Sequence, residues 1–230
     1  PAVISALNSG VELEKSFATF AMREILSGNT EPDQIKEFLI AHADKGATAS
    51  EVGAFIEVMY EHAAPLEITE RAVDVVGTGG DGFHTINIST ASAIVCAASG
   101  AKIMKHGNRA ASSKSGAADL LEALGVNISL DGVGVAETFK QLGIGFCFAQ
   151  KFHPAMRNAA AVRKELAVPT VFNILGPLAN PAQPQAAAIG VANERMHLVM
   201  AQVLGDRGVD GFVFRFTALH FLLHRPQTPR

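Results

Sequence analysis

The chain has 230 residues, a length that allows one large domain or two smaller ones around a proper hydrophobic core. Hydrophobic residues make up 48% of it and charged residues 18%, which favours a buried α/β interior over a disordered or fibrous chain. The formal net charge of −3 provides no basic excess for binding DNA or an anionic membrane, so any positive potential must be local. We expect a cytoplasmic protein, because there is neither an apolar signal core nor a run of membrane-spanning length.

The first third of the chain has the apolar spacing of helices. One stripe ends at Gly28, where a C-cap residue is wanted, and the next begins at Pro32 and ends at Gly46. A third stops before Pro65. These helices carry no recognisable chemistry, and we interpret them as scaffold or subunit interface.

From residue 71 onward, short β-branched runs alternate with helical ones. The predicted strands are 72–76, 102–104, 126–129, 144–149, 188–191 and 211–214. The predicted helices are 90–98, 116–124, 133–142, 156–166 and 195–204. This alternation predicts a mainly parallel sheet covered on both faces, whose ligands bind at the carboxyl ends of the strands. The proline-punctuated stretch 168–178 is interpreted as an irregular connection.

The two cysteines, Cys96 and Cys147, each lie in an apolar run. A free cysteine behaves as a small hydrophobic residue and is commonly buried. We therefore expect two buried thiols in a reducing compartment, and neither a disulfide nor a metal site.

A glycine-rich loop follows the first predicted strand and reads Gly77-Thr78-Gly79-Gly80-Asp81-Gly82. Its glycines allow a tight turn with several N–H groups directed into one space, an arrangement that binds phosphate. The loop satisfies the dinucleotide pattern G-x-G-x-x-G. However, seven residues separate it from the next helix, and lysines stand where an acid is wanted about 20 residues on. A P-loop motif, G-x-x-x-x-G-K-S/T, is absent from the sequence as well.

Two further polar loops follow, Asn87-Ile88-Ser89-Thr90 and Lys105-His106-Gly107-Asn108-Arg109. The first precedes a helix, where hydroxyls and N–H groups at the positive end of the dipole suit phosphate. The second brings two cations together, which repel each other unless an anion joins them. Taken singly, helix capping and solvated surface charges explain these residues equally well. Taken together, the three loops predict a pocket for a polyphosphorylated small molecule.

In order and spacing, these loops resemble those of the anthranilate phosphoribosyltransferases of the tryptophan pathway. The resemblance also includes Ala110-Ala111-Ser112-Ser113 and Asn173-Ile174-Leu175-Gly176-Pro177-Leu178. The likeness extends to about Phe214. It implies transfer of the phosphoribosyl group of phosphoribosyl pyrophosphate (PRPP) to the amine of anthranilate, with Mg²⁺ as cofactor. It also implies a homodimer formed through helices, with no nucleic-acid or membrane partner.

The resemblance implies an α/β fold of the nucleoside-phosphorylase type with an N-terminal helical domain. Residues 1–69, joined by 156–180, would form the helical dimerisation domain. Residues 70–155 and 181–214 would form the PRPP-binding α/β domain, and 215–230 an atypical tail.

The resemblance also assigns roles to individual residues. The residues implied to bind PRPP are Gly77, Gly79, Gly80, Asp81, Thr85, Asn87, Ile88, Ser89, Thr90, Lys105, His106, Gly107, Asn108, Arg109, Ala110, Ala111, Ser112, Ser113 and Ala117. Those implied to bind anthranilate are Gly77, His106, Asn108, His153 and Arg163. Ser89 would be a magnesium ligand, and the catalytic residues would be Lys105, Asn108 and Arg163. A guanidinium such as that of Arg163 suits a benzoate carboxylate through paired hydrogen bonds.

The chain departs from the family after Phe214. The family carries an adjacent Asp-Glu pair there that holds a second magnesium, whereas residues 216–223 contain no carboxylate. The run 216–224 shows neither helical nor strand alternation. We therefore expect an incomplete sheet with an unpaired strand edge, and impaired catalysis.

Two alternatives remain open. One is a non-enzymatic paralogue of the same fold that binds nucleic acid, which requires a broad basic face. The other is a pyrimidine nucleoside phosphorylase, which shares the architecture.

Overall fold

A computed structural model of the chain describes residues 1–79, 86–110, 115–166 and 168–214, and the backbone of residues 221–224. The N-terminal helices are α1 (Ala2–Asn8), α2 (Lys15–Ser27), α3 (Pro32–Lys45) and α4 (Ala49–Glu61). The predicted ends of α2 and α3 are confirmed: Gly28 and Gly46 follow them with φ of 76° and 88°. Thr48 and Glu51 form a capping box at the start of α4, and α1 was not predicted.

Strands and helices then alternate along the chain. The strands are β1 (Val73–Gly77), β2 (Ile103–Gly107), β3 (Ile144–Phe148), β4 (Ala186–Gly190), β5 (Asp210–Phe214) and β6 (Phe221–His224). The helices are α5 (Ile88–Ala98), α6 (Ala117–Ala123), α7 (Gly132–Leu142), α8 (Ala149–Phe152), α9 (Arg157–Leu166), α10 (Phe172–Leu178) and α11 (Glu194–Asp206). A single 3-10 turn at Pro154–Met156 separates α8 from α9.

The strands form one sheet in the order β3-β2-β1-β4-β5-β6. The first five are parallel to one another, which confirms the predicted mainly parallel sheet. The chain order reverses at β1, which lies between β2 and β4. In open parallel sheets the ligand crevice forms at such a reversal. The loops that follow β1 and β2 are thus neighbours at the position where a ligand is expected.

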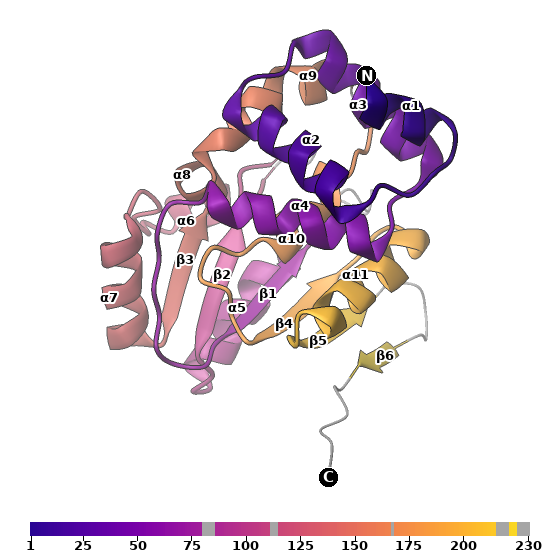
Figure 1. The fold of residues 1–230 in the computed structure, drawn as a ribbon. Helices are drawn as coiled ribbons and strands as arrows, with labels where there is room; N and C mark the ends of the chain where they lie inside the picture. The colour runs from indigo at the N-terminus through magenta and orange to yellow at the C-terminus, as the bar shows by residue number, and fades with distance from the viewer. Residues whose placement is uncertain (80–85, 111–114, 167, 215–220, 225–230) are drawn as a thin grey trace.

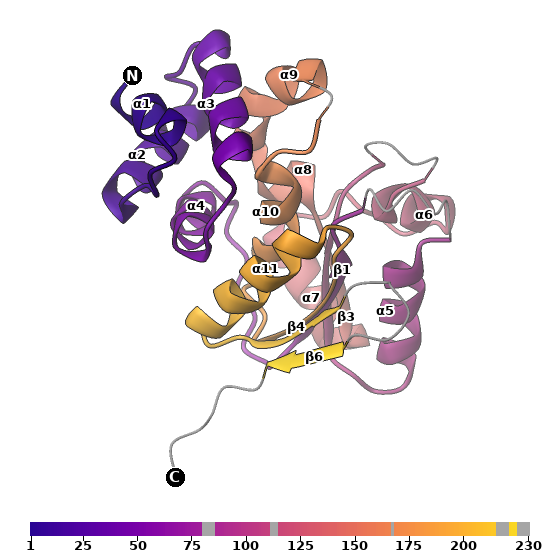
Figure 2. The ribbon, with the colours of Figure 1, turned by 90° about the vertical axis from the view of Figure 1, so that its right-hand side faces the viewer.

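Helices cover both faces of the sheet (Figures 1 and 2). α10 and α11 lie on the face turned toward the N-terminal helices, and α5 and α6 lie on the other face. One hydrophobic core extends from α1–α4 through α9–α11 to β1, β4 and β5, with Val76, Ile189 and Val213 contributed by the sheet. The N-terminal helices and the sheet therefore share a core, and α9 packs on α3.

Four expectations are corrected. Residues 126–129 form a turn, because Val126 N–H bonds the carbonyl of Leu121 and Ser129 N–H bonds the side chain of Asn127, and this local bonding prevails over strand propensity. Residues 172–178 form α10, whose buried apolar side chains hold the helix although Pro177 lies in it. β6 pairs antiparallel with β5 and covers the edge expected to be open. Cys147 is buried as expected, but Cys96 is exposed on α5.

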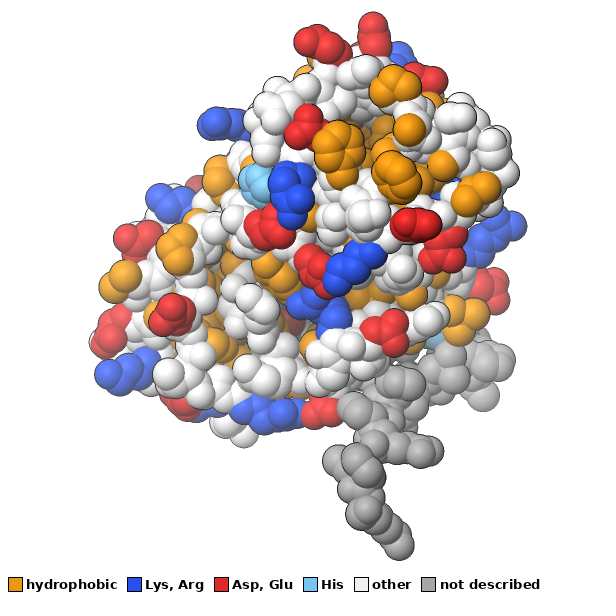
Figure 3. All heavy atoms as spheres, viewed as in Figure 1, with side chains coloured by type: hydrophobic (Ala, Val, Ile, Leu, Met, Phe, Trp, Pro, Cys, Tyr) orange, Lys and Arg blue, Asp and Glu red, His pale blue; other side chains and the backbone are white. Residues whose placement is uncertain are grey.

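Large hydrophobic side chains are exposed on α2 and on the loop that precedes it. Val11, Phe17 and Phe20 have 54%, 46% and 56% of their surface exposed, and Figure 3 shows hydrophobic side chains gathered over this part of the molecule. The same view shows basic and acidic side chains interspersed over the rest of the face. None of the helices formed by the described residues combines the length and apolar character needed to cross a lipid bilayer.

Candidate active site

Lys105, near the end of β2, is a buried cation. Only 2% of its surface is exposed. Its Nζ donates to the carbonyl oxygen of Val75 at 2.6 Å and lies 3.4 Å from Oγ of Ser89, in the first turn of α5. Among the described residues no carboxylate forms an ion pair with it, and burial lowers its pKa, although the field of Asp74 opposes this. A buried ammonium with neutral contacts is costly and marks a functional site.

A buried carboxylate, that of Asp74, interacts electrostatically with the ammonium of Lys105. Asp74 accepts hydrogen bonds from the N–H of His106 at 3.1 Å and from the amide of Asn180 at 2.9 Å. Asn180 also donates to the carbonyl of Met104 at 2.8 Å. Burial raises the pKa of Asp74 to about 6, although Lys105 and these hydrogen bonds lower it. Neither Asp74 nor Asn180 is among the predicted site residues, and the only signal for Asp74 in the sequence is an acid inside the apolar run of β1.

His106 follows Lys105 and makes its contacts on the other face of the sheet. Its Nδ1–H donates to the carbonyl of Gly176 in α10 at 2.9 Å. Nε2 is therefore an acceptor, and it is buried without a partner among the described residues. Burial, with the neighbouring His153, lowers the pKa of His106 to about 3. His106 is thus a neutral imidazole with one unused acceptor.

His153 lies beside His106, and their ring centroids are 5.4 Å apart. Nε2–H of His153 donates to the carbonyl of Ala179 at 2.7 Å, and burial lowers the pKa of its ring. Arg163 of α9 stacks over the ring of Phe172, at 5.0 Å from the ring centroid. Together with its C-cap residue Ala179, α10 thus contacts three of the predicted anthranilate-site side chains, those of His106, His153 and Arg163.

The structure describes only the first part of the glycine loop, Gly77 to Gly79. Gly79 has a φ of 65°, and Thr78 N–H bonds the carbonyl of Gly190 at 2.9 Å. In the first turn of α5, Thr90 is buried with an Oγ1 that has no hydrogen-bond partner among the described residues, whereas Ile88 is exposed. The predicted PRPP-binding residues Gly80, Asp81, Thr85, Ala111, Ser112 and Ser113 lie outside the described residues.

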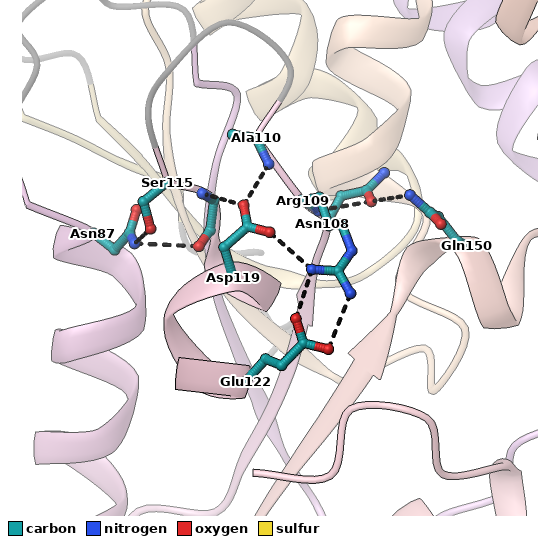
Figure 4. Close-up of polar contacts among 9 residues, drawn as sticks. Asn87, Asn108, Arg109, Ala110, Ser115, Asp119, Glu122 and Gln150 are labelled. Carbon is teal, nitrogen blue, oxygen red and sulfur yellow. Dashed lines mark hydrogen bonds and ion pairs between the residues drawn. The ribbon is translucent and has the colours of Figure 1, made fainter. Parts of the chain in front are cut away.

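The loop after β2 is held by side chains around it (Figure 4). Oδ1 of Asn108 accepts hydrogen bonds from the N–H of Arg109 at 2.8 Å and from Gln150 at 3.4 Å. The guanidinium of Arg109 bonds Asp119 at 2.9 Å and Glu122 at 2.8 and 3.1 Å. Lys105 and Arg109 therefore do not form the pair of facing cations that their spacing suggested.

Ala117, the last of the predicted PRPP-binding residues, begins α6, directly beside the β2 loop. Its Cβ would lie 2.9 Å from a Cβ added at Gly107. Position 107 therefore has no room for a larger residue beside Ala117.

The described residues fit magnesium only when it is bound as a complex with a diphosphate. Ser89 could supply a single hydroxyl ligand, and the described residues contain no group of three or more His, Cys, Asp or Glu side chains able to hold a metal. The neighbouring ammonium of Lys105 would repel a bare cation. Mg²⁺ commonly keeps its waters and binds through substrate phosphates, so one protein hydroxyl is compatible with such a complex.

Comparison with known proteins gives a consistent result. The chain matches the model of the glycosyl transferase family helical bundle domain over residues 1–63 and that of the family's a/b domain over residues 69–216. It is 53% identical over 215 residues to the anthranilate phosphoribosyltransferase of Arthrobacter sp. (strain FB24), a match that covers 94% of this chain and 61% of that relative. These matches confirm the resemblance found in the sequence.

Solved structures show the same relationship. The crystal structure of anthranilate phosphoribosyltransferase from Thermus thermophilus is 44% identical with a TM-score of 0.88, and the match covers 93% of this chain and 65% of that one. The Saccharomyces cerevisiae enzyme in complex with PRPP and Mg is 29% identical with a TM-score of 0.84, covering 92% and 64%. The chain thus spans less than two thirds of the length of these relatives.

Proposed function

Because this chain belongs to the glycosyl transferase family with a helical bundle and an a/b domain, we propose that it acts as an anthranilate phosphoribosyltransferase. It would transfer the phosphoribosyl group of PRPP to the amine of anthranilate, giving N-(5-phosphoribosyl)anthranilate and pyrophosphate. Its relatives of that name support the substrate pair, and the structure of the yeast relative with PRPP and Mg supports the cofactor.

The observation that carries this proposal is the buried ammonium of Lys105 beside Ser89. Without an anion, a buried charge of this kind costs several kcal/mol, by order of magnitude. A diphosphate placed there removes that cost and gains charge-assisted hydrogen bonds of about 1.5–3 kcal/mol each. The N-terminus of α5 adds N–H groups and a favourable dipole. Main-chain groups of the Gly77 and Lys105–Ser113 loops complete the proposed PRPP site.

The acceptor substrate would lie on the His106 face. The unpartnered Nε2 of His106 can accept an N–H of the anthranilate amine, and Arg163 can bind the carboxylate. His153, next to His106, would close this side of the pocket, and Gly77 and Asn108 would line its mouth. An arylamine is weakly basic, so no strong general base is required for its attack on the anomeric carbon.

The proposed PRPP site and the proposed anthranilate site would meet at the end of β2. Since consecutive residues of a strand point to opposite faces, Lys105 and His106 would hold the two substrates on either side of the end of β2. Catalysis would come from holding amine and anomeric carbon in line, and from stabilising negative charge on the leaving pyrophosphate with Lys105. Magnesium bound to the pyrophosphate would neutralise part of the same charge, with Ser89 as its protein ligand.

We also propose a homodimer formed through the N-terminal helices. The exposed Val11, Phe17 and Phe20 provide the apolar surface that such an interface requires. The predicted division into a helical unit (1–69 with 156–180) and an α/β unit (70–155 with 181–214) belongs to the same proposal.

Turnover distinguishes this function from the phosphorylase alternative. The loss of anthranilate fluorescence on addition of PRPP and Mg²⁺ is the expected result, at a rate reduced because residues 216–223 contain no carboxylate, with no release of base from thymidine and phosphate. Phosphorolysis without anthranilate consumption would favour a pyrimidine nucleoside phosphorylase. Salt-sensitive DNA retention in a gel shift would favour the nucleic-acid-binding paralogue, which the net charge of −3 disfavours. On the face drawn in Figure 3 the basic and acidic side chains are interspersed.

A further inference from the structure

The carboxylate of Asp119 joins the two ends of the loop that follows β2 (Figure 4). Its Oδ2 accepts a hydrogen bond from the N–H of Ala110 at 3.0 Å and from that of Gly116 at 2.8 Å. These two amides lie six positions apart in the chain but share one oxygen atom. Because Asp119 lies in the first turn of α6, the loop ends are fixed to a helix.

Packing at Gly116 shows how closely the two ends approach. A Cβ atom added at Gly116 would lie 2.3 Å from the nitrogen of Ala110 and 2.7 Å from the carbonyl oxygen of Asn108. The same carbonyl accepts the N–H of Ala118 at 3.1 Å. From the other side, the amide of Asn87 donates to the carbonyl of Gly116 at 3.2 Å. The loop after β2 is thereby tied to the N-terminus of α5, where the diphosphate is proposed to bind.

The remaining oxygen of Asp119 holds Arg109. Oδ1 accepts from Nη1 of Arg109, and Glu122 binds the same guanidinium with both of its oxygens. The two loop amides and Arg109 lower the pKa of Asp119, so the carboxylate stays ionised near neutral pH. Arg109 consequently has two carboxylates as partners before any substrate arrives.

We propose that Asp119 is a positioning residue for PRPP, and that Arg109 acts through Asp119 rather than on the diphosphate. Asp119 fixes the N–H groups of Ala110 and Gly116 and thereby holds Asn108, Arg109 and Ala110 in place for the anion. Arg109 neutralises the carboxylate and orients it. The identity of the ligand, PRPP, rests on the proposed function, whereas the hydrogen bonds of Asp119 do not depend on it. It follows that, of the two described cations Lys105 and Arg109, only Lys105 is left to bind the diphosphate through its side chain.

Four variants test this proposal: Asp119→Ala, Asp119→Asn, Arg109→Ala and the double variant Arg109→Ala/Asp119→Ala. Asp131→Ala is the matched control, because Asp131 caps α7 by accepting from Gly134 N–H at 2.9 Å and lies outside the site. Two quantities are measured: the exchange rates of the Ala110 and Gly116 amides by NMR, and the calorimetric affinity for PRPP with Mg²⁺. A thermal melt of each variant verifies folding, which is expected since the Asp119 side chain is 30% exposed.

We expect Asp119→Ala to accelerate exchange of both amides and to weaken PRPP binding about ten- to a hundredfold. Asp119→Asn, which keeps an acceptor oxygen, should recover part of both losses. Arg109→Ala should weaken binding less than Asp119→Ala, and the double variant should bind like Asp119→Ala alone. The Asp131→Ala control should bind PRPP like the wild type.

Additive losses in the double variant, or a larger loss for Arg109→Ala, would make Arg109 a direct ligand and overturn the inference. Unchanged amide exchange in Asp119→Ala would overturn it as well. If the wild-type chain bound no PRPP, the proposed function would fail on that result. The amide exchange rates would then still decide whether Asp119 fixes the loop.

Discussion

Lys105 and His106 are consecutive residues, both almost fully buried, with opposite electrostatic requirements. The ammonium of Lys105 needs an anion, whereas His106 is held neutral with an unused acceptor. Their side chains lie on opposite faces of the sheet, because neighbouring side chains of a strand point to opposite faces. One short segment can thus serve a charged substrate on one face and an amine on the other.

The protonation state of His106 can be checked directly. Because burial and His153 lower its pKa to about 3, the ring should remain neutral, with the proton on Nδ1, from pH 8 down to at least about pH 4. Imidazole ¹⁵N shifts in long-range correlation spectra report both tautomer and charge. A ring that titrates near its usual value of 6.5 would contradict the buried geometry described here.

At the scale of elements, the predicted strands were correct where strand propensity and buried position agree, as in β1 and β2. The loops that follow them could be predicted because glycine, hydroxyl and lysine residues have few structural reasons to gather at strand ends. Residues 126–129 were assigned wrongly, since the Asn127 turn depends on local side-chain bonding that alternation does not reveal. The sequence likewise placed Asp119 in a helix without indicating that it bonds Ala110, because that contact depends on the loop conformation.

The loop between β2 and α6 should be sensitive to a single methyl group. Gly116→Ala places a Cβ against backbone atoms that cannot give way, so we expect at least tenfold weaker PRPP binding, and a loss of stability of about 1–3 kcal/mol. Gly53→Ala is the control, because nothing lies within 4 Å of an added Cβ at this position of α4. That variant should be stabilised by about 0.5–1 kcal/mol. Calorimetry and urea unfolding measure both effects, and equal behaviour of the two variants would refute the tight loop closure.

At the scale of the whole molecule, the N-terminal helices contain a buried acid on which stability depends. Glu51 has no exposed surface, and accepts from the N–H of Leu13 at 2.8 Å and from Nζ of Lys45 at 2.9 Å. Burial by itself raises the pKa of Glu51, but His42, whose Nε2 lies 3.3 Å from Oε2 of Glu51, and the hydrogen bonds from Leu13 and Lys45 outweigh it and lower the pKa to about 2. Because the helices and the sheet share one core, loss of this contact should destabilise both.

The lowered pKa of Glu51 makes the free energy of unfolding depend on pH. A carboxyl with a lowered pKa in the folded state contributes stability above its ordinary value of 4.5, and this contribution is lost as pH falls toward 2. Glu51→Gln should therefore be less stable by about 3 kcal/mol at pH 7 and should lack this part of the acid dependence. Urea unfolding followed by circular dichroism measures it, since the chain has no tryptophan. Glu57→Gln, which loses only the exposed pair with Lys15, should change stability by less than about 1 kcal/mol. A wild-type-like acid profile for Glu51→Gln would contradict the assigned role.

The most direct measurement is a calorimetric titration of Lys105→Met with PRPP and Mg²⁺, beside Lys102→Met. Lys102 immediately precedes β2 and pairs with Glu70 at 3.1 Å, so its variant controls for loss of a lysine at the far end of the same strand. We expect Lys105→Met to bind PRPP at least about a hundredfold more weakly. A thermal melt verifies that the variant folds, because the substitution also removes the cation whose field lowers the pKa of the buried Asp74. An unchanged isotherm for Lys105→Met, or the same loss in Lys102→Met, would contradict the assignment of the buried lysine to the diphosphate.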